Sequence, residues 1–118
     1  MSNIIIYGIP NCDTIKKTLD WFKQHNIDYQ FHDYKKSGIT KERLNSWCKL
    51  VGWETVLNKK SSTWRALTPE VQAKITSQAA AVKLMQENTS IIKRPVIEKN
   101  NEISIVGLDV IKYNQLFL

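Results

Sequence analysis

The sequence of 118 residues predicts an α/β fold built on a mixed four-stranded sheet. Three observations support this prediction. A strand, an amphipathic helix and a second strand follow one another at the start of the chain, the middle of the chain carries helical patterns throughout, and two short apolar segments flank a polar turn near the end. We therefore expect the order β-α-β, helical insert, β-β-α. The length suits one domain over residues 1–118, with the insert at about 40–88.

The first elements form a βαβ unit. Residues 3–8 are apolar and predict a buried strand, residues 12–25 predict an amphipathic helix, and residues 27–33 predict a second strand with alternating apolar side chains. The apolar positions are Ile15, Leu19 and Phe22 in the helix and Ile27, Tyr29 and Phe31 in the second strand. A helical crossover joins parallel strands with a right-handed connection, so the carboxyl ends of both strands should lie at one edge of the sheet.

The insert shows several helix signals. Thr40 is a suitable N-cap for a helix that ends at Gly52, because Leu44, Trp47, Cys48 and Val51 recur at helical spacing. Thr68, Pro69 and Glu70 form a second start signal, after which Val71 and Ile75 are expected to face inward. Residues 78–88 are rich in alanine and predict a third helix.

The last part of the chain predicts a hairpin and a closing helix. Val96 and Ile97 are separated from the apolar residues 103–106 by the turn residues Asn100 and Asn101, which is typical of two antiparallel strands. Gly107 ends the hairpin, and the apolar residues from 110 to 118 suggest a short helix.

Cys12 is the candidate nucleophile. The strand at residues 3–8 is broken by Pro10 and Asn11, so Cys12 is expected at the start of the following helix. Backbone amides and the helix dipole at such a position favour the thiolate over the thiol. Lys16 and Lys17, one turn further on, could add positive field. The alternative interpretation is that Cys12 is an inert, partly buried small residue, as many free cysteines are.

Two arginines are candidate anion-binding residues. Arg94 precedes Pro95 at the expected start of the third strand, and its planar guanidinium can hold an oxyanion or carboxylate and favour a thiolate. Arg65 lies in the polar stretch 61–67, predicted as a loop that could fold over the cysteine. The alternatives are that Pro95 simply opens a strand and that Arg65 makes a surface salt bridge or caps a helix end.

Other residues that often carry chemistry are assigned no catalytic role, with the two histidines expected to be structural or exposed. Cys48 lies on the apolar stripe of its helix, which predicts a core position and not a resolving thiol. His25 and His32 lack the spacing of a metal site or a catalytic triad, and the chain has no CxxC or HExxH motif. We therefore expect neither a metal nor a tightly bound cofactor. The four tryptophans are interpreted as core residues, although Trp64 could line a cleft beside Arg65.

Composition limits compartment and partners. Two cysteines, without a secretory signal or a long apolar segment, indicate a reducing cytoplasmic setting and no membrane association. The formal charge of +6 permits anionic ligands such as glutathione, but the basic residues are scattered pairs without an RNA-binding motif. We expect a monomer with a basic, solvated surface and no specific nucleic-acid partner.

Three blocks of sequence, taken with the order of elements, resemble a known family. The blocks are residues 8–17, with the sequence GIPNCDTIKK, the pair Trp64 and Arg65, and residues 93–96, with the sequence KRPV. The element order resembles a thioredoxin-like fold, and the blocks resemble the arsenate reductase (ArsC), Spx and YffB family, most closely its YffB branch. The resemblance covers essentially the whole chain. In such folds the proline that opens the third strand is typically preceded by a cis bond and faces the cysteine, which implies a cis Arg94–Pro95 bond near Cys12.

The resemblance also implies a function. It implies a thiol-dependent reductase that uses glutathione as cosubstrate, with a glutaredoxin for recycling and a small oxyanion or a disulfide as substrate. Cys12 would be the nucleophile, Arg65 and Arg94 would hold the anion or glutathione beside Pro95, and Asn11, Asp13 and Thr14 would belong to the oxyanion loop.

Two departures separate this chain from other branches. It has no arginine after Arg94, where glutaredoxin-linked arsenate reductases use a third one, and Ile15 occupies the second cysteine position of the Spx CxxC motif. Both departures favour the YffB branch. The competing interpretation is an Spx-like adaptor that binds an RNA polymerase subunit without turnover.

Overall fold

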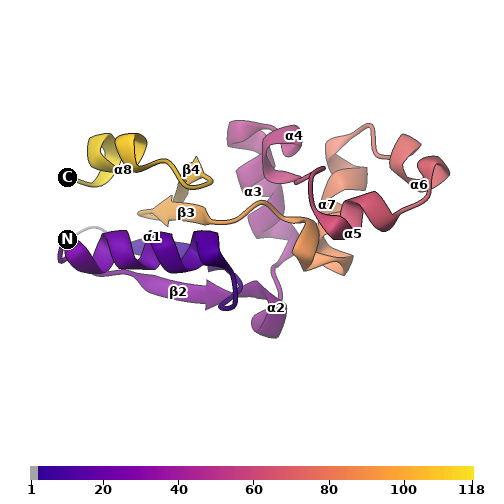
Figure 1. The fold of residues 1–118 in the computed structure, drawn as a ribbon. Coiled ribbons are helices and arrows are strands. Elements are labelled where there is room, and N and C mark those ends of the chain that lie inside the picture. The colour runs from indigo at the N-terminus through magenta and orange to yellow at the C-terminus, as the bar shows by residue number, and fades with distance from the viewer. Residues whose placement is uncertain (1–2) are drawn as a thin grey trace. The chain divides into compact units, whose positions relative to one another are not determined.

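A computed structural model describes residues 3–118 of the chain. These residues form two compact units, which Figure 1 shows as a ribbon. The first unit comprises the residues up to Tyr34 together with residues 94–118, and the second comprises residues 35–93. The first unit contains the sheet, and the second is helical.

The sheet of the first unit has four strands in the order β2-β1-β3-β4. The strands are β1 (Ile4–Gly8), β2 (Gln30–Asp33), β3 (Val96–Lys99) and β4 (Glu102–Val106). The β1 and β2 strands are parallel, whereas β3 runs antiparallel to both β1 and β4. The parallel pair is expected, because α1 provides the crossover between its strands. Asn100 and Asn101 both have positive φ in the turn between β3 and β4, a conformation that asparagine tolerates.

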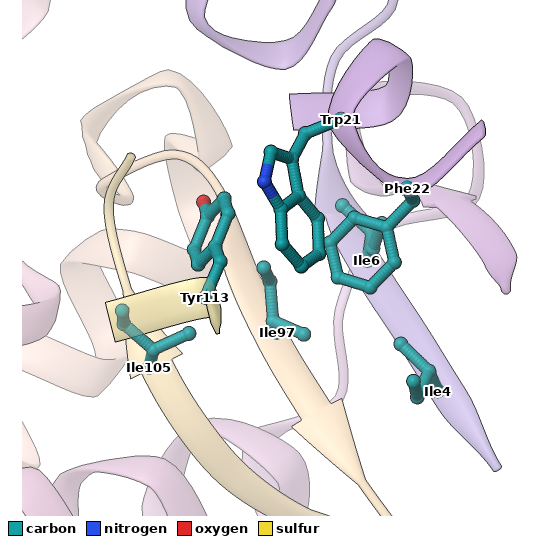
Figure 2. Packing of buried hydrophobic residues seen from close by; sticks show 7 residues of the cluster. All are labelled: Ile4, Ile6, Trp21, Phe22, Ile97, Ile105 and Tyr113. Atoms are coloured by element: carbon teal, nitrogen blue, oxygen red, sulfur yellow. The ribbon is translucent and has the colours of Figure 1, made fainter. Parts of the chain in front are cut away.

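Helices α1 (Asp13–Gln24) and α8 (Val110–Phe117) belong to the same unit and contribute to one apolar cluster. Figure 2 shows Trp21 and Phe22 from α1, with Tyr113 from α8, around isoleucine side chains of the sheet. The Trp21 and Tyr113 ring centroids are 5.3 Å apart in an edge-to-face arrangement. The isoleucines are Ile4, Ile6, Ile97 and Ile105. Because alternate strand residues face one side of a sheet, α1 and α8 cover the same side.

Two contacts define the β1 strand further. A Cβ placed on Gly8 would clash with the Cδ1 atom of Ile15 and lie 2.9 Å from its Cγ1 atom, so glycine is what lets α1 pack close to β1. On the other side of the sheet, the Tyr7 hydroxyl donates a 2.7 Å hydrogen bond to Oε1 of Glu98. Glu98 is only 1% exposed, and this bond satisfies part of the hydrogen-bonding capacity of its buried carboxylate.

The second unit consists of short helices. Its helices are α3 (Lys41–Val51), α4 (Trp53–Val56), α5 (Ser62–Ala66), α6 (Pro69–Ala73), α7 (Gln78–Glu87) and the 3-10 helix η1 (Thr89–Ile91), while α2 (Tyr34–Ser37) begins at the last residue before the unit. The N-cap side chains of α3, α5, α6 and α7 all accept a hydrogen bond from a first-turn amide. These caps are Thr40, Ser61, Thr68 and Ser77. The α3 and α7 helices are in contact, and their buried side chains include Leu44, Trp47, Cys48 and Met85.

The structure confirms the predicted α/β class, the mixed four-stranded sheet and the element order. Three local expectations were wrong. The second strand begins at Gln30 and not at residue 27, the expected loop at 61–67 contains the helix α5, and Val71 is 38% exposed although it was expected to face inward. The single-domain organisation stays a prediction. Within residues 3–118, no helix is both long enough and apolar enough to cross a membrane.

Candidate active site around Cys12

Cys12 lies between the end of β1 and the start of α1, as predicted. It is the N-cap residue of α1, with extended backbone angles (φ −140°, ψ 126°), and its carbonyl accepts the first helical hydrogen bond from the Lys16 amide at 2.9 Å. Its side chain makes no capping hydrogen bond and is partly exposed. The thiol is therefore at a helix N-terminus and in reach of solvent, which are two conditions for a reactive cysteine.

The residues on either side of Cys12 form the turn that was assigned to the oxyanion loop. Asn11 and Asp13 are exposed, and Thr14 is half-buried in the first turn of α1. The amides of residues 13–15 precede the first hydrogen bond of the helix, so they have no partner within it. Such amides, with the helix dipole, can bind an anion. The carboxylate of Asp13 adds the opposite charge in the same turn.

Arg94 and Pro95 lie at the same edge of the sheet as Cys12. Tyr7, near the carboxyl end of β1, pairs with Val96, the first residue of β3. Pro95 therefore directly precedes β3 at the sheet edge where β1 ends. The Arg94–Pro95 bond is cis, as the resemblance implied. Pro95 is buried and Arg94 is half-buried.

Tyr34 is a residue of this region that was not predicted from the sequence. It follows Asp33, the β2 residue that pairs with Gly8 of β1, and it is fully buried. Burial raises the pKa of Tyr34 well above its usual value, Arg94 acts to lower that pKa, and Cys12 and Asp33 act to raise it. Two candidate site residues, Arg94 and Cys12, are thus among the groups that act on the pKa of Tyr34.

Arg65 belongs to the second unit, so its predicted closeness to Cys12 stays a prediction. It is exposed in the last turn of α5. That short helix is fixed at both ends, because the Ser61 hydroxyl accepts a bond from the Trp64 amide at 3.1 Å, and the Gln72 side-chain amide donates to the Trp64 carbonyl at 2.8 Å. Trp64 is 8% exposed, and the Lys59 ammonium lies 5.7 Å from the centre of its ring.

Cys48 and the two histidines have the structural settings that the sequence indicated. Cys48 is 3% exposed, and burial raises the pKa of its thiol to about 11. His25 is the C-cap residue of α1, and its Nδ1 atom lies 2.8 Å from the Trp21 carbonyl oxygen. The His32 ring packs on Tyr7, with the centroids 4.9 Å apart. Across residues 3–118, no group of three or more His, Cys, Asp or Glu side chains is arranged to hold a metal ion.

Comparison with known proteins agrees with this geometry. The sequence model of the ArsC family matches residues 7–113. The solved structure of a protein named YFFB is 38% identical, with a TM-score of 0.90 over 98% of this chain and all of that chain. The structure of an arsenate reductase (ArsC) related protein from Brucella melitensis is 42% identical, with a TM-score of 0.77 over 98% of this chain and 94% of that chain.

A more distant curated relative is the global transcriptional regulator Spx of Streptococcus pyogenes, which is 23% identical over 86% of this chain and 76% of its own length. The similarity therefore includes both arsenate reductase-related proteins and regulators. With the family match running from β1 to α8, and the cysteine, the arginine and the cis proline at one edge of a thioredoxin-like sheet, the chain belongs to the ArsC family.

Proposed function

We propose that this protein is a glutathione-dependent thiol reductase with Cys12 as its nucleophile. The observation that supports the proposal most is the setting of Cys12, which is a partly exposed residue at the N-cap of α1. The half-buried Arg94 belongs to the same unit and lies at the same edge of the sheet. A helix N-terminus and a fixed positive charge are, in general, the setting in which a thiolate is favoured over a thiol.

The proposed reaction has two exchange steps. In the first, the Cys12 thiolate attacks the glutathione sulfur of a mixed disulfide R–S–S–G, so that a Cys12–glutathione disulfide forms and the thiolate RS⁻ leaves and takes up a proton. In the second, the thiolate of another glutathione attacks the glutathione sulfur of that disulfide. This attack releases the Cys12 thiolate and oxidised glutathione. The substrate is reduced, and two glutathione units end as one disulfide.

An external thiol is needed because the chain offers no suitable second cysteine. The only other cysteine, Cys48, is buried, and its raised pKa keeps it in the unreactive thiol form at neutral pH. We therefore assign the resolving step to glutathione, with a glutaredoxin as a candidate recycling partner. This chemistry suits the cytoplasm, where the glutathione pool keeps thiols reduced.

The other site residues are proposed to bind the charged parts of the substrate. Arg94 and Arg65 would bind carboxylates of glutathione or a small oxyanion, because a guanidinium forms paired hydrogen bonds with such groups. Asn11, Asp13 and Thr14 would present backbone amides to the developing negative charge. Pro95 would shape the edge of the sheet where glutathione binds.

The test is a turnover assay with bis(2-hydroxyethyl) disulfide and glutathione, in which formation of oxidised glutathione is followed. Wild type and Cys48→Ala should turn over at similar rates, because Cys48 takes no part in the exchange. Cys12→Ser should lose essentially all activity, because a hydroxyl cannot form the mixed disulfide. Mass spectrometry should find one glutathione on Cys12 of the wild type after incubation with oxidised glutathione.

Two results would contradict the proposal. Cys12→Ser with turnover close to the wild type would exclude Cys12 as the nucleophile. A wild-type protein that neither forms the glutathione adduct nor turns over would exclude the reductase itself. Circular dichroism of each variant ensures that the comparison is made between folded proteins.

The similarity to Spx favours one second candidate, an adaptor that binds an RNA polymerase subunit. An adaptor works through its surface and does not require a reactive thiol. Tagged wild type and Cys12→Ser should then retain purified RNA polymerase α subunit equally well. Retention of the α subunit by neither protein would exclude this candidate.

A further inference from the structure

Tyr34 lies at the sheet edge that carries Cys12. Asp33, the last residue of β2, pairs in register with Gly8, the last residue of β1, and Tyr34 follows at once. Because β1 and β2 are parallel, the chain segments that leave their carboxyl ends emerge at one edge. One of these segments leads to Cys12 and the other begins with Tyr34, whose side chain is completely buried.

The charged groups that act on the pKa of Tyr34 include two groups of the thiol site. The groups that act on its ionisation are Arg94, Cys12 and Asp33, in addition to its own burial. Burial keeps the phenol protonated, since taking the phenolate out of water is costly. A phenol that stays neutral is a hydrogen-bond donor whose dipole can stabilise an anion without adding charge.

We propose that Tyr34 is a positioning residue of the Cys12 site, whose buried hydroxyl, together with the Arg94 guanidinium, stabilises the Cys12 thiolate. This inference rests on the proposed function in that the thiolate is the species that reacts. Asp33 and the thiolate both carry negative charge, and both act to raise the pKa of Tyr34. A neutral hydrogen-bond donor and the positive charge of Arg94 are therefore favourable neighbours for the thiolate.

The effect should be visible in the reactivity of Cys12. The test is alkylation by iodoacetamide over a range of pH in the Cys48→Ala background, which leaves Cys12 as the only thiol. Tyr34→Phe keeps the buried ring and removes the hydroxyl. We expect the midpoint of the pH–rate profile to move to higher pH and the rate at neutral pH to fall about three- to tenfold, the range that the loss of one such interaction covers.

Tyr113→Phe is the matched control. Tyr113 is also fully buried in the first unit, and its hydroxyl donates a 2.7 Å hydrogen bond to the Gly107 carbonyl in the α8 core. Its substitution removes the same atom from a buried tyrosine and should lower stability, but it should leave the pH–rate profile of Cys12 unchanged. An unchanged profile in a folded Tyr34→Phe variant would overturn the inference, as would an equal shift in both variants.

A second measurement uses the protein with Tyr34 intact. With tyrosine labelled by ¹³C at Cζ, the Tyr34 signal should follow the ionisation of Cys12 in the wild type and lose that response in Cys12→Ala. A Tyr34 signal that ignores the state of Cys12 would also overturn the inference. Neither experiment needs glutathione or a substrate. A wild-type protein with neither glutathione adduct nor turnover would therefore refute the proposed reductase, whereas the alkylation and labelling results alone decide the role of Tyr34.

Discussion

The two cysteines occupy opposite chemical environments. Cys12 is partly exposed at a helix N-cap, whereas Cys48 is 3% exposed among apolar side chains of the second unit. Burial penalises the charged form of a thiol, and it raises the pKa of Cys48 to about 11. One thiol is thus accessible to reagents, and the other is packed in the core and protonated at neutral pH.

The environment of Cys48 predicts a loss of stability at alkaline pH. Burial raises the pKa of its thiol from the ordinary value of 9.0 to about 11 in the folded chain. The folded state therefore binds this proton more tightly than the unfolded state, and the resulting stabilisation is fully present below pH 9 and is lost as the pH rises through 11. On going from about pH 8 to about pH 11, the free energy of unfolding of the wild type should fall by about 2 kcal/mol more than that of Cys48→Ala.

The measurement is urea unfolding of both proteins at the two pH values in the presence of a phosphine reductant. The other groups that titrate in this range, such as the lysines, are common to both proteins, so they cancel in the comparison. Equal losses for the wild type and Cys48→Ala would show that the thiol is not held protonated by burial.

At the level of residues, sequence reasoning proposed the candidate site residues that have local signatures. The prediction of Cys12 rested on a strand pattern that is broken at Pro10 and a helix pattern that begins soon afterwards. The prediction of Arg94 rested on the proline beside it. Tyr34 had no such signature. It stands among polar residues after a strand, and its burial depends on tertiary packing. The interpretation of Arg65 as a site residue depends on tertiary structure in the same way.

Among the elements, the junction of β1 and α1 has the tightest steric requirement. A Cβ at Gly8 would clash with Ile15, which is fully buried and belongs to the first turn of the helix that carries Cys12. We expect Gly8→Ala to destabilise the protein by about 1–3 kcal/mol, the usual range for an overpacked core. The displaced helix start should also change the alkylation rate of Cys12.

Gly38→Ala provides a comparison for this prediction. Gly38 has a positive φ of 71°, but nothing lies within 4 Å of the position of an added Cβ. Its substitution should lower the free energy of unfolding by about 1 kcal/mol through backbone strain, and it should leave the alkylation rate of Cys12 unchanged. Chemical denaturation gives the stabilities, and iodoacetamide labelling gives the rates. A Gly8→Ala variant that matches the wild type in both would contradict the steric argument.

The elements that the sequence predicted well are those with enough residues to show a period. The helices α1, α3 and α7 have 10–12 residues each, and their apolar spacing and start signals were recognisable. The helices α2, α4 and α5 have four or five residues, which is too short for a helical period to appear. Ile27 and Tyr29 fitted a strand pattern, but they precede β2 and pack against the apolar cluster instead.

For the whole molecule, the net charge of +6 should act on the approach of charged reagents. The field of scattered surface charges extends over about 30 Å at 0.01 M salt and is screened within about 8 Å at physiological salt. Iodoacetate and iodoacetamide have almost the same size and differ in charge. The ratio of their alkylation rates at Cys12 therefore reports the electrostatic potential at the thiol.

We expect the iodoacetate to iodoacetamide rate ratio to fall several-fold between about 0.01 M and about 0.5 M salt, because screening removes the long-range part of the attraction. Arg94→Gln should lower the ratio at every salt concentration, since it removes a charge at the sheet edge that carries Cys12. Lys23→Gln changes the net charge equally, but Lys23 lies in the last turn of α1, about 16 Å along the helix from Cys12. Its effect should be small and should vanish at high salt. Equal effects of the two substitutions would mean that Cys12 senses only the total charge and that Arg94 contributes no local field.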